Sequence, residues 1–330
     1  MEYIPILLVF VFYFIGVPVA YALFAAALFY FTFYDAGMPV DLVLQRFITA
    51  TASFPLLAVP FFIMAGSVMN HAGISKKLML MASVLTGHFR GGLAQVNVVL
   101  STLMGGVSGS ANADAAMQSK ILVPQMVKSG YNPAFSAAIT AASSAVSPVI
   151  PPGIVLIIYA LIAQVSVAKM FIAGYVPGLI MASALMITVS MLAKRRGYKP
   201  LREQGATGRE MAAQFYDSFW ALALPIGIVI GLRFGLFTPT EAGAIAVLAA
   251  VLIGLFIYKE LTRSHFVPIL KDTMYGTSSV VLVIVAASVF GYYLTWEQIP
   301  QRLTALLIEF TDNPYLLLAI LNVFLLLLGM

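Results

Sequence analysis

Long apolar runs, separated by short polar breaks, dominate the chain. They cover residues 4–34, 53–70, 92–104, 111–127, 133–147, 153–165, 170–193, 218–235, 237–258, 275–296 and 314–330. A helix needs about 20 apolar residues to cross a bilayer, and continuous rather than alternating runs indicate helices instead of strands. The pattern therefore predicts an all-α polytopic membrane protein with about nine to eleven crossings.

Two neighbouring runs, 92–104 and 111–127, are joined by a turn rich in Gly and Ser. As a helix the first run would be about 20 Å long, which is too short to cross the hydrocarbon core. The pair predicts a re-entrant helical hairpin over 92–127, whose tip must be surrounded by protein or by a water-filled cavity. The next two runs predict a broken helix over 133–165.

Composition supports a lipid-exposed protein and argues against several other classes. Hydrophobic residues make up 61% of the chain and charged residues 9%, whereas soluble domains carry about 25% charged residues. The chain has no cysteine and three scattered His residues, so neither a thiolate nor a His-rich metal site is expected. No basic stretch is interleaved with aromatic residues, and we expect no nucleic-acid partner.

The two halves of the chain resemble each other. Residues 73–78 match 298–303, and residues 97–100 match 322–325, both at an offset of 225. The resemblance predicts a first repeat over 1–193, a polar linker over 194–217 and a second repeat over 218–330.

Charge bias indicates that these repeats are inverted. Cytoplasmic loops collect Lys and Arg, and the linker 194–217 holds six of them. With this linker in the cytoplasm, the basic loop 259–272 also falls inside, whereas its counterpart, the acidic loop 35–43, falls outside. Inverted repeats with broken helices are typical of secondary transporters.

The hairpin tip, Gly105–Ala115, combines residues that suit ion binding. Its Gly residues expose backbone carbonyls, and Ser108 and Ser110 add hydroxyl oxygens, which are the ligands that a small alkali cation needs. The helix after the tip points its N-terminus at the turn, where its dipole favours an anion. A packing seam of small residues is the alternative, but Asn112 and Asp114 are polar, and an intramembrane carboxylate usually has a function.

A second motif, Ser143–Gly153, is expected to break a helix at mid-span. Its three prolines remove backbone donors, so that the carbonyls near Ser144 and Ser147 lose their helical partners and can face a cation. The following helix again points its N-terminus at the break. A simple proline kink is the alternative, and the serine cluster favours a binding site.

Four stretches of the chain together resemble a known family. They are SGSANADA (108–115), PVIPPGIVLIIYA (148–160), AGYVPGLIMA (173–182) and FGLFTPTEAGAIAV (234–247). They resemble the large permease subunit of tripartite ATP-independent periplasmic (TRAP) transporters, and the similarity extends over essentially the whole chain. The resemblance implies an inverted-repeat, elevator-type fold of the ion-transporter superfamily in the bacterial inner membrane.

The resemblance also implies a function and partners. Such a subunit is expected to work with a small four-helix membrane subunit and a periplasmic substrate-binding protein. It is expected to import a small carboxylate, such as a C4-dicarboxylate, sialic acid or a related organic acid. A sodium gradient would drive uptake, with Na⁺ as the coupling ion, no other cofactor and no catalysis.

The site residues follow from the same resemblance. It implies that Ser108 and Ser110 ligate one sodium ion, which carbonyls around Ser147, Ile150 and Pro152 complete. The substrate is expected beside the other polar positions and the helix start of the two motifs: Asn112, Asp114, Ser144 and Gly153. At the offset of 225 a second hairpin tip would begin at position 330, so a second ion site is not expected within these residues.

Two other functions fit parts of the sequence. Gly106–Gly109 fits a Gly-x-Ser-Gly nucleophile pattern, and an intramembrane serine protease using Ser108 is therefore an alternative. We expect no His at the depth of Ser108 to serve as its base. A passive channel, or a scaffold for a partner, would keep the membrane spans without requiring two ion-ligand motifs.

Overall fold

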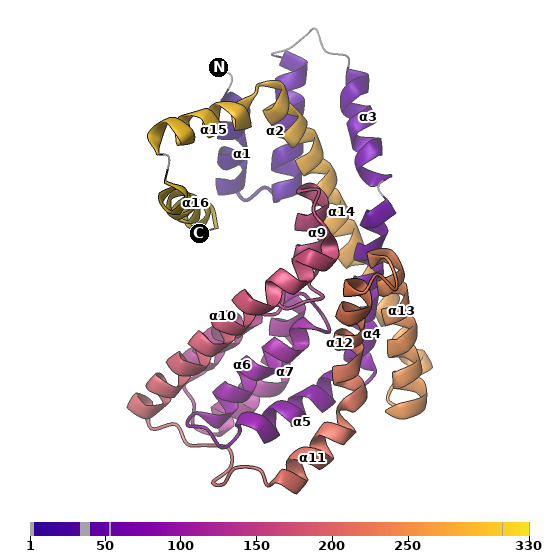
Figure 1. Cartoon of the computed structure of the whole chain (residues 1–330), viewed down its shortest axis with the longest axis vertical. Helices are drawn as coiled ribbons and strands as arrows, with labels where there is room; N and C mark the ends of the chain where they lie inside the picture. Colours follow the sequence, from indigo (N-terminus) through magenta and orange to yellow (C-terminus); the bar gives the residue numbers. More distant parts are fainter. Residues whose placement is uncertain (1–2, 34–39, 53, 312, 330) are drawn as a thin grey trace. The chain divides into compact units, whose positions relative to one another are not determined.

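A computed structural model describes residues 3–33, 40–52, 54–311 and 313–329, and in these ranges every regular element is a helix (Figure 1). In chain order they are α1 (Ile4–Phe14), α2 (Val19–Phe33), α3 (Val40–Thr51), η1 (Phe54–Leu57), α4 (Ala58–His71), α5 (Ile74–Thr86), α6 (Gly92–Gly105), α7 (Ala111–Lys128), α8 (Pro133–Ser144), α9 (Ile154–Ile162), α10 (Val167–Arg196), α11 (Gly208–Asp217), α12 (Phe219–Arg233), α13 (Pro239–Leu252), η2 (Ile253–Ile257), η3 (Arg263–His265), α14 (Phe266–Trp296), α15 (Ile299–Phe310) and α16 (Pro314–Gly329).

The long apolar runs form helices, and the polar breaks lie between them. Among the described residues, three segments are long and apolar enough to cross a membrane: Val167–Arg196, Pro239–Ile257 and Arg263–Trp296. Helices α11 and α12, which meet at a bend of 65°, pass the same test together, and α1, α2, α6 and part of α16 are shorter apolar helices. The all-α polytopic fold is thus confirmed, and the number of crossings stays a prediction.

Four amphipathic helices, α3, α5, α11 and α15, were not predicted. In α5 the buried residues Ile74, Leu78 and Met81 recur at helical spacing, with polar residues between the first two. Such a helix contains no long apolar run, and a search for apolar runs does not find it. Helix α11 lies inside the predicted linker and begins with a capping box, in which Thr207 and Glu210 each accept a backbone N–H of the other.

The chain divides into two compact units. The smaller unit consists of Met1–Ala52 and Ser279–Met330, and the larger unit is Ser53–Ser278. Each unit draws on both predicted repeats, so the division into units differs from the division into repeats. The repeat boundaries and their inverted relation stay predictions, and most of the predicted acidic loop 35–43 lies outside the described residues.

In the smaller unit, aromatic side chains of α2 pack against the second half of α14. The rings of Tyr30 and Tyr293 lie 4.7 Å apart and those of Phe31 and Tyr292 lie 5.8 Å apart, measured between centroids. The Tyr30 hydroxyl also donates a hydrogen bond to Glu297. Such ring pairs add to the stabilisation that burial alone provides.

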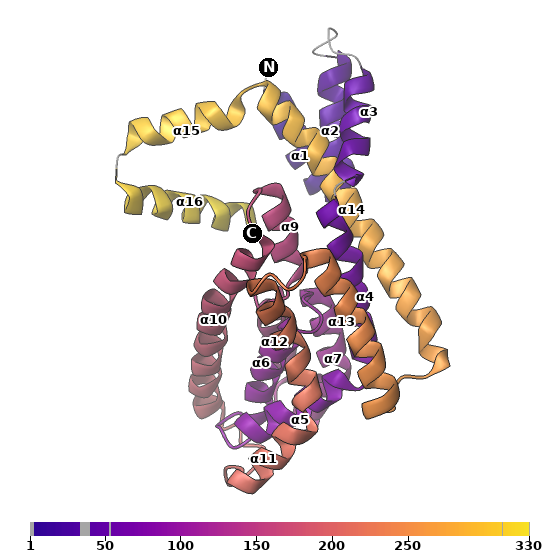
Figure 2. The same ribbon diagram turned by 45° about the vertical axis from the view of Figure 1, so that its right-hand side comes forward.

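In the larger unit, α4 and α13 pack closely through small residues. Ala242, Ala246 and Ala250 of α13 are buried, and a methyl group added to Gly243 would lie 2.7 Å from Cβ of Phe61. Small residues at such a seam let helix backbones approach each other. Helix α12 lies beside α13, as Figure 2 shows.

Gly243→Ala should destabilise this seam, because the added methyl forces α4 and α13 apart at a cost of about 1–3 kcal/mol. Gly227→Ala is the matched control on α12, where the methyl meets no atom within 4 Å and Ala is the better helix former. The measurement is the thermal unfolding midpoint of each variant in detergent. Equal midpoints for the two variants would contradict the close α4–α13 packing.

Candidate functional site

The predicted hairpin is formed by α6 and α7, which lie side by side. Helix α6 ends at Gly105, and the turn that follows contains Gly109 at a φ of 54°, in the left-handed region that favours glycine. Ser110 caps α7 by accepting the N–H of Ala113 at 3.4 Å, and Ser108 is buried. The N-terminus of α7 therefore points at the tip, as predicted.

The predicted broken helix is formed by α8 and α9. Helix α8 ends at Ser144, α9 begins at Ile154, and the segment between them contains a cis peptide bond between Pro151 and Pro152. The Ser144 carbonyl still accepts the N–H of Ser147. Within the described ranges no backbone hydrogen bond reaches the carbonyls of Ala145 or of residues 147–152. Of the two carbonyls named in the prediction, the one of Ser144 is therefore paired and the one of Ser147 is free.

The hairpin tip and the proline break are in direct contact. A methyl group added to Gly105 would lie 2.5 Å from Cβ of Ile150 and 2.8 Å from the carbonyl oxygen of Ser147. A methyl group added to Gly109 would lie 2.8 Å from the carbonyl oxygen of Pro152. Glycine at both positions lets the two backbones approach this closely, and two of the free carbonyls lie against the tip. We call this region the tip–break contact.

Three other helices enclose the tip–break contact. Gly66 of α4 lies against Ser108, where an added methyl would be 3.1 Å from its Cα, and Gly106 lies against Pro225 of α12. Gly174 of α10 approaches the break from the other side, against a backbone carbonyl. Protein therefore surrounds this irregular backbone, which is the condition for non-helical segments at membrane depth.

Behind the tip, α7 carries a fully buried pair of polar side chains, Asp114 and Gln118. Gln118 Nε2 donates to Asp114 Oδ1 at 2.8 Å and to Ser101 Oγ at 2.6 Å. Ser144 is a further neighbour of the Asp114 carboxyl group. Among the described residues, Asp114 Oδ2, Gln118 Oε1 and Ser147 Oγ are buried without a hydrogen-bond partner. Buried polar atoms are normally paired, and a bound ion would supply partners for these oxygens.

A second buried network joins the hairpin to the broken helix. Asn97 Nδ2 donates to Thr140 Oγ1 at 2.8 Å, and Ser143 Oγ donates to Asn97 Oδ1 at 2.6 Å. Sequence reasoning missed Asn97 and Ser101, which lie within the apolar run of α6. Their spacing of four residues places both on one helix face, and this was the signal that would have identified them.

The structure brings together some of the predicted site residues and separates others. The predicted sodium positions Ser108, Ser147, Ile150 and Pro152 are buried at the tip–break contact, and Ser110 is half-buried beside them.

The predicted substrate positions do not share one surface. Asn112 is exposed, whereas Asp114, Ser144 and Gly153 are buried. Residues two apart on a helix point about 200° from each other, so Asn112 and Asp114 occupy opposite faces of α7. The roles of these residues in binding stay predictions.

The oxygens gathered here are neutral hydroxyl and carbonyl groups, with one carboxylate behind them. This donor set suits a hard monovalent cation. Within the described ranges, no three His, Asp or Glu side chains cluster as they do around a transition metal.

The protease alternative requires a base beside Ser108. Ser108 Oγ donates to the Met104 carbonyl at 3.4 Å. His71 bonds to a backbone carbonyl of its own helix and its ring lies tilted against that of His265, and His88 makes an edge-on contact with the ring of Phe89. In the part of the chain that the structure describes, none of the recorded contacts joins a His to Ser108.

Comparison with known proteins gives one matching family and several relatives. The family model described as "Tripartite ATP-independent periplasmic transporter, DctM component" matches residues 6–330. The sialic acid TRAP transporter permease protein SiaT of Haemophilus influenzae is 39% identical, over 99% of this chain and 53% of its own length. Two large permease proteins are each 37% identical over 96% of this chain: the sialic acid protein SiaM of Vibrio cholerae, over 73% of its length, and the 2,3-diketo-L-gulonate protein YiaN of Escherichia coli, over 74%. The chain thus spans about half the length of the first and about three quarters of the other two.

Gln118→Leu should lower the free energy of unfolding by about 1–3 kcal/mol, because it leaves the buried Asp114 carboxyl group and Ser101 without their donor. Asn112→Ala, on the exposed face of the same helix, should change it by no more than about 0.5 kcal/mol. Denaturant unfolding in detergent measures both. Equal losses in the two variants would contradict the assignment of Asp114 and Gln118 to the buried face.

Proposed function

This chain belongs to the DctM component family of TRAP transporters, whose members are large, multi-pass permeases of the inner membrane, and we propose that it belongs to a sodium-coupled importer of a small carboxylate. The named substrates of its relatives, sialic acid and 2,3-diketo-L-gulonate, are both small organic acids. They support this substrate class for the present chain.

The tip–break contact is the observation that carries the proposal. Sodium would be held by Ser147 Oγ, by free carbonyls of residues 147–152 and by Ser108 and Ser110 at the tip. The buried, unpaired hydroxyl of Ser147 and the free carbonyls support this assignment, because a small cation needs several hard oxygen ligands within a protein-lined cavity.

The substrate carboxylate is proposed to bind at the N-terminus of α7, where the helix dipole favours an anion. Ser110 and Asn112 remain accessible there, whereas Asp114 and Ser144 are buried. We therefore assign Asp114 and Ser144 a supporting role behind the site, where they fix the shape of the tip.

Transport is proposed as a property of an assembly. The family description names a tripartite, periplasmic system, which supports a small four-helix membrane subunit and a periplasmic binding protein as partners. Because the chain spans only part of the length of its relatives, uptake is proposed for the full-length large subunit together with these partners.

In proteoliposomes that contain the full-length large and small subunits, with the binding protein outside, an imposed sodium gradient should drive uptake. Labelled sialic acid and succinate serve as probes. Ser147→Ala should raise the sodium concentration for half-maximal uptake about tenfold, which corresponds to about 1.4 kcal/mol of lost binding. Ser119→Ala is the control, because Ser119 is exposed on α7 and bonds only within its own helix.

Equal uptake with and without the gradient, for both probes, would refute sodium coupling. Flux that does not saturate with probe concentration would instead favour the passive channel.

A further inference from the structure

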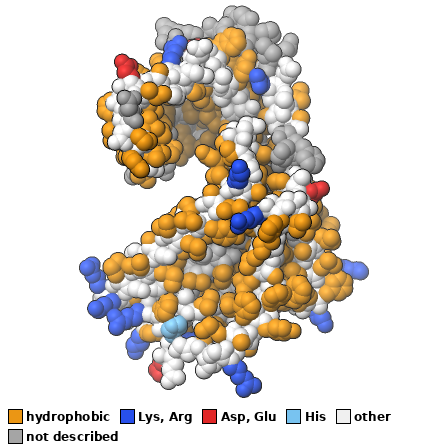
Figure 3. Space-filling view, viewed as in Figure 1, with side chains coloured by type: hydrophobic (Ala, Val, Ile, Leu, Met, Phe, Trp, Pro, Cys, Tyr) orange, Lys and Arg blue, Asp and Glu red, His pale blue; other side chains and the backbone are white. Residues whose placement is uncertain are grey.

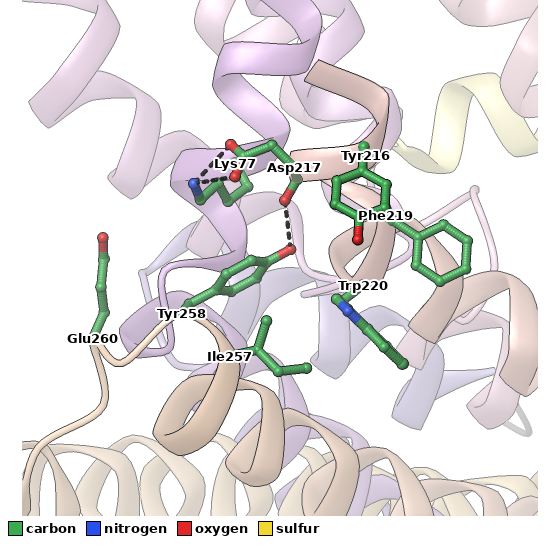
Figure 4. Close-up of a pocket in the computed structure, with 8 residues that line it drawn as sticks. All are labelled: Lys77, Tyr216, Asp217, Phe219, Trp220, Ile257, Tyr258 and Glu260. Atoms are coloured by element: carbon green, nitrogen blue, oxygen red, sulfur yellow. Dashed lines mark hydrogen bonds and ion pairs between the residues drawn. The ribbon is translucent and has the colours of Figure 1, made fainter. Parts of the chain in front are cut away.

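A cavity of about 530 Å³ opens where α11 meets α12, beside the end of η2 (Figure 4). Lys77 of α5 donates to both carboxylate oxygens of Asp217, at 2.8 and 2.7 Å. The Tyr258 hydroxyl accepts the N–H of Ala221 at 3.2 Å and donates to the Asp217 carbonyl at 3.3 Å. Burial raises the pKa of Tyr258, so this phenol keeps its proton and its bond. These contacts fix the polar wall of the cavity, which we call the head cavity.

Aromatic rings form the rest of the head cavity. Tyr216, Phe219 and Trp220 lie together on one side of it, across from Lys77 and Tyr258 (Figure 4). All three rings are at least 44% exposed. Faces of aromatic rings attract ammonium groups, so this wall suits a ligand that carries a positive charge.

The charges of the head cavity suit a zwitterion. One cation, Lys77, and two carboxylates, Asp217 and Glu260, line it, which gives the wall an excess of negative charge. Glu260 also pairs with Lys76 outside the cavity, at 2.8 Å, but Lys76 is largely exposed, and such surface pairs are weak. An ammonium group would meet the Asp217 carboxylate and the rings, and an attached phosphate would meet Lys77 (Figure 4).

A second cavity, of about 440 Å³, adjoins the first between α12 and α13 and is almost wholly apolar. Trp220 and Ile257 line both cavities, so the two are adjacent. Leu224, Leu252 and Phe256 line the second cavity further along. It lies against Pro239–Ile257, one of the segments long and apolar enough to span the membrane. We call it the tail groove.

The side chains on the surface of the larger unit indicate which of the two cavities lies nearer the lipid headgroups and which lies nearer the hydrocarbon. Lys and Arg side chains gather at the end that carries α5, α11 and the C-terminus of α10, and hydrophobic side chains cover the face beyond them (Figure 3). The head cavity lies at the charged end, and Trp220 lies where it joins the tail groove. Tryptophan is typical of the boundary between headgroups and hydrocarbon. Polar and apolar cavities therefore follow each other in the order in which a phospholipid presents its headgroup and chains.

We propose that the head cavity and tail groove together bind one phospholipid with an ethanolamine headgroup, from the leaflet beside the basic segment 194–217. The phosphate contacts Lys77, the ammonium group contacts Asp217 and the aromatic wall, and one acyl chain occupies the tail groove. A phosphatidylglycerol headgroup carries the same phosphate charge but no ammonium group. Its net charge is therefore negative, and it does not match this wall. The bound lipid would hold α11 at its 65° bend to α12.

The first experiment uses the two tryptophans of the chain, Trp220 and Trp296. In nanodiscs, with Trp296→Phe to leave Trp220 as the only tryptophan and with excitation selective for tryptophan, phosphatidylethanolamine brominated on its chains should quench fluorescence and saturate at a low mole fraction. Brominated phosphatidylglycerol should require at least a tenfold higher fraction.

Equal quenching by both lipids, in proportion to their mole fraction, would mean ordinary boundary lipid and overturn the proposal. No quenching by either lipid would mean that another protein segment covers the groove, and would overturn it too.

The second experiment counts bound lipids by native mass spectrometry of the purified chain. Asp217→Asn and Trp220→Ala should each lower retention of added phosphatidylethanolamine about tenfold. Phe234→Ala is the control, because Phe234 is 73% exposed at the other end of α12, and it should retain the lipid. Thermal unfolding of each variant shows whether it is folded. Folded Asp217→Asn and Trp220→Ala variants that both retain the lipid like the wild type would contradict the proposal.

Discussion

The contact between the hairpin tip and the proline break is the feature on which the larger unit depends. In a bilayer an unpaired carbonyl costs several kcal/mol, so irregular backbone persists only where protein or a wet cavity surrounds it. The carbonyls of residues 147–152 meet this condition because the tip and α10 lie against the break, and α4 and α12 lie against the tip. The glycines at 105 and 109 make the contact possible, since any side chain there would separate the two backbones.

Two buried polar networks hold this contact in place. Asn97, Thr140 and Ser143 join α6 to α8, and Gln118 joins Asp114 to Ser101 within the hairpin. In a low-dielectric interior such bonds are strong when satisfied and costly when broken. The first network therefore ties the hairpin to the broken helix, and the second keeps α6 and α7 together within the hairpin.

The sequence was sufficient to predict the apolar helices, the hairpin and the break, because continuous apolar runs, clustered glycines and clustered prolines each have a direct structural consequence. It did not predict the four amphipathic helices, which no long apolar run marks. It was not sufficient to orient α7: the residues around Asn112 and Asp114 are nearly all small, so periodicity does not indicate which face is buried. Asn97 was missed because it lies inside an apolar run. The α4–α13 seam depends on tertiary packing at Gly243, which sequence patterns do not report.

The most direct test of the central claim is the thermal unfolding of the purified chain in sodium chloride and in potassium chloride at equal ionic strength. The proposed sodium ligands all lie within residues 108–152, so the chain itself should bind the ion. A ligand at 100 times its Kd adds about 2.7 kcal/mol to stability. We expect sodium to raise the unfolding midpoint in a saturable way, potassium not to do so, and Ser147→Ala to shift the saturation to higher sodium concentration. Identical midpoints in the two salts at every concentration would contradict the account.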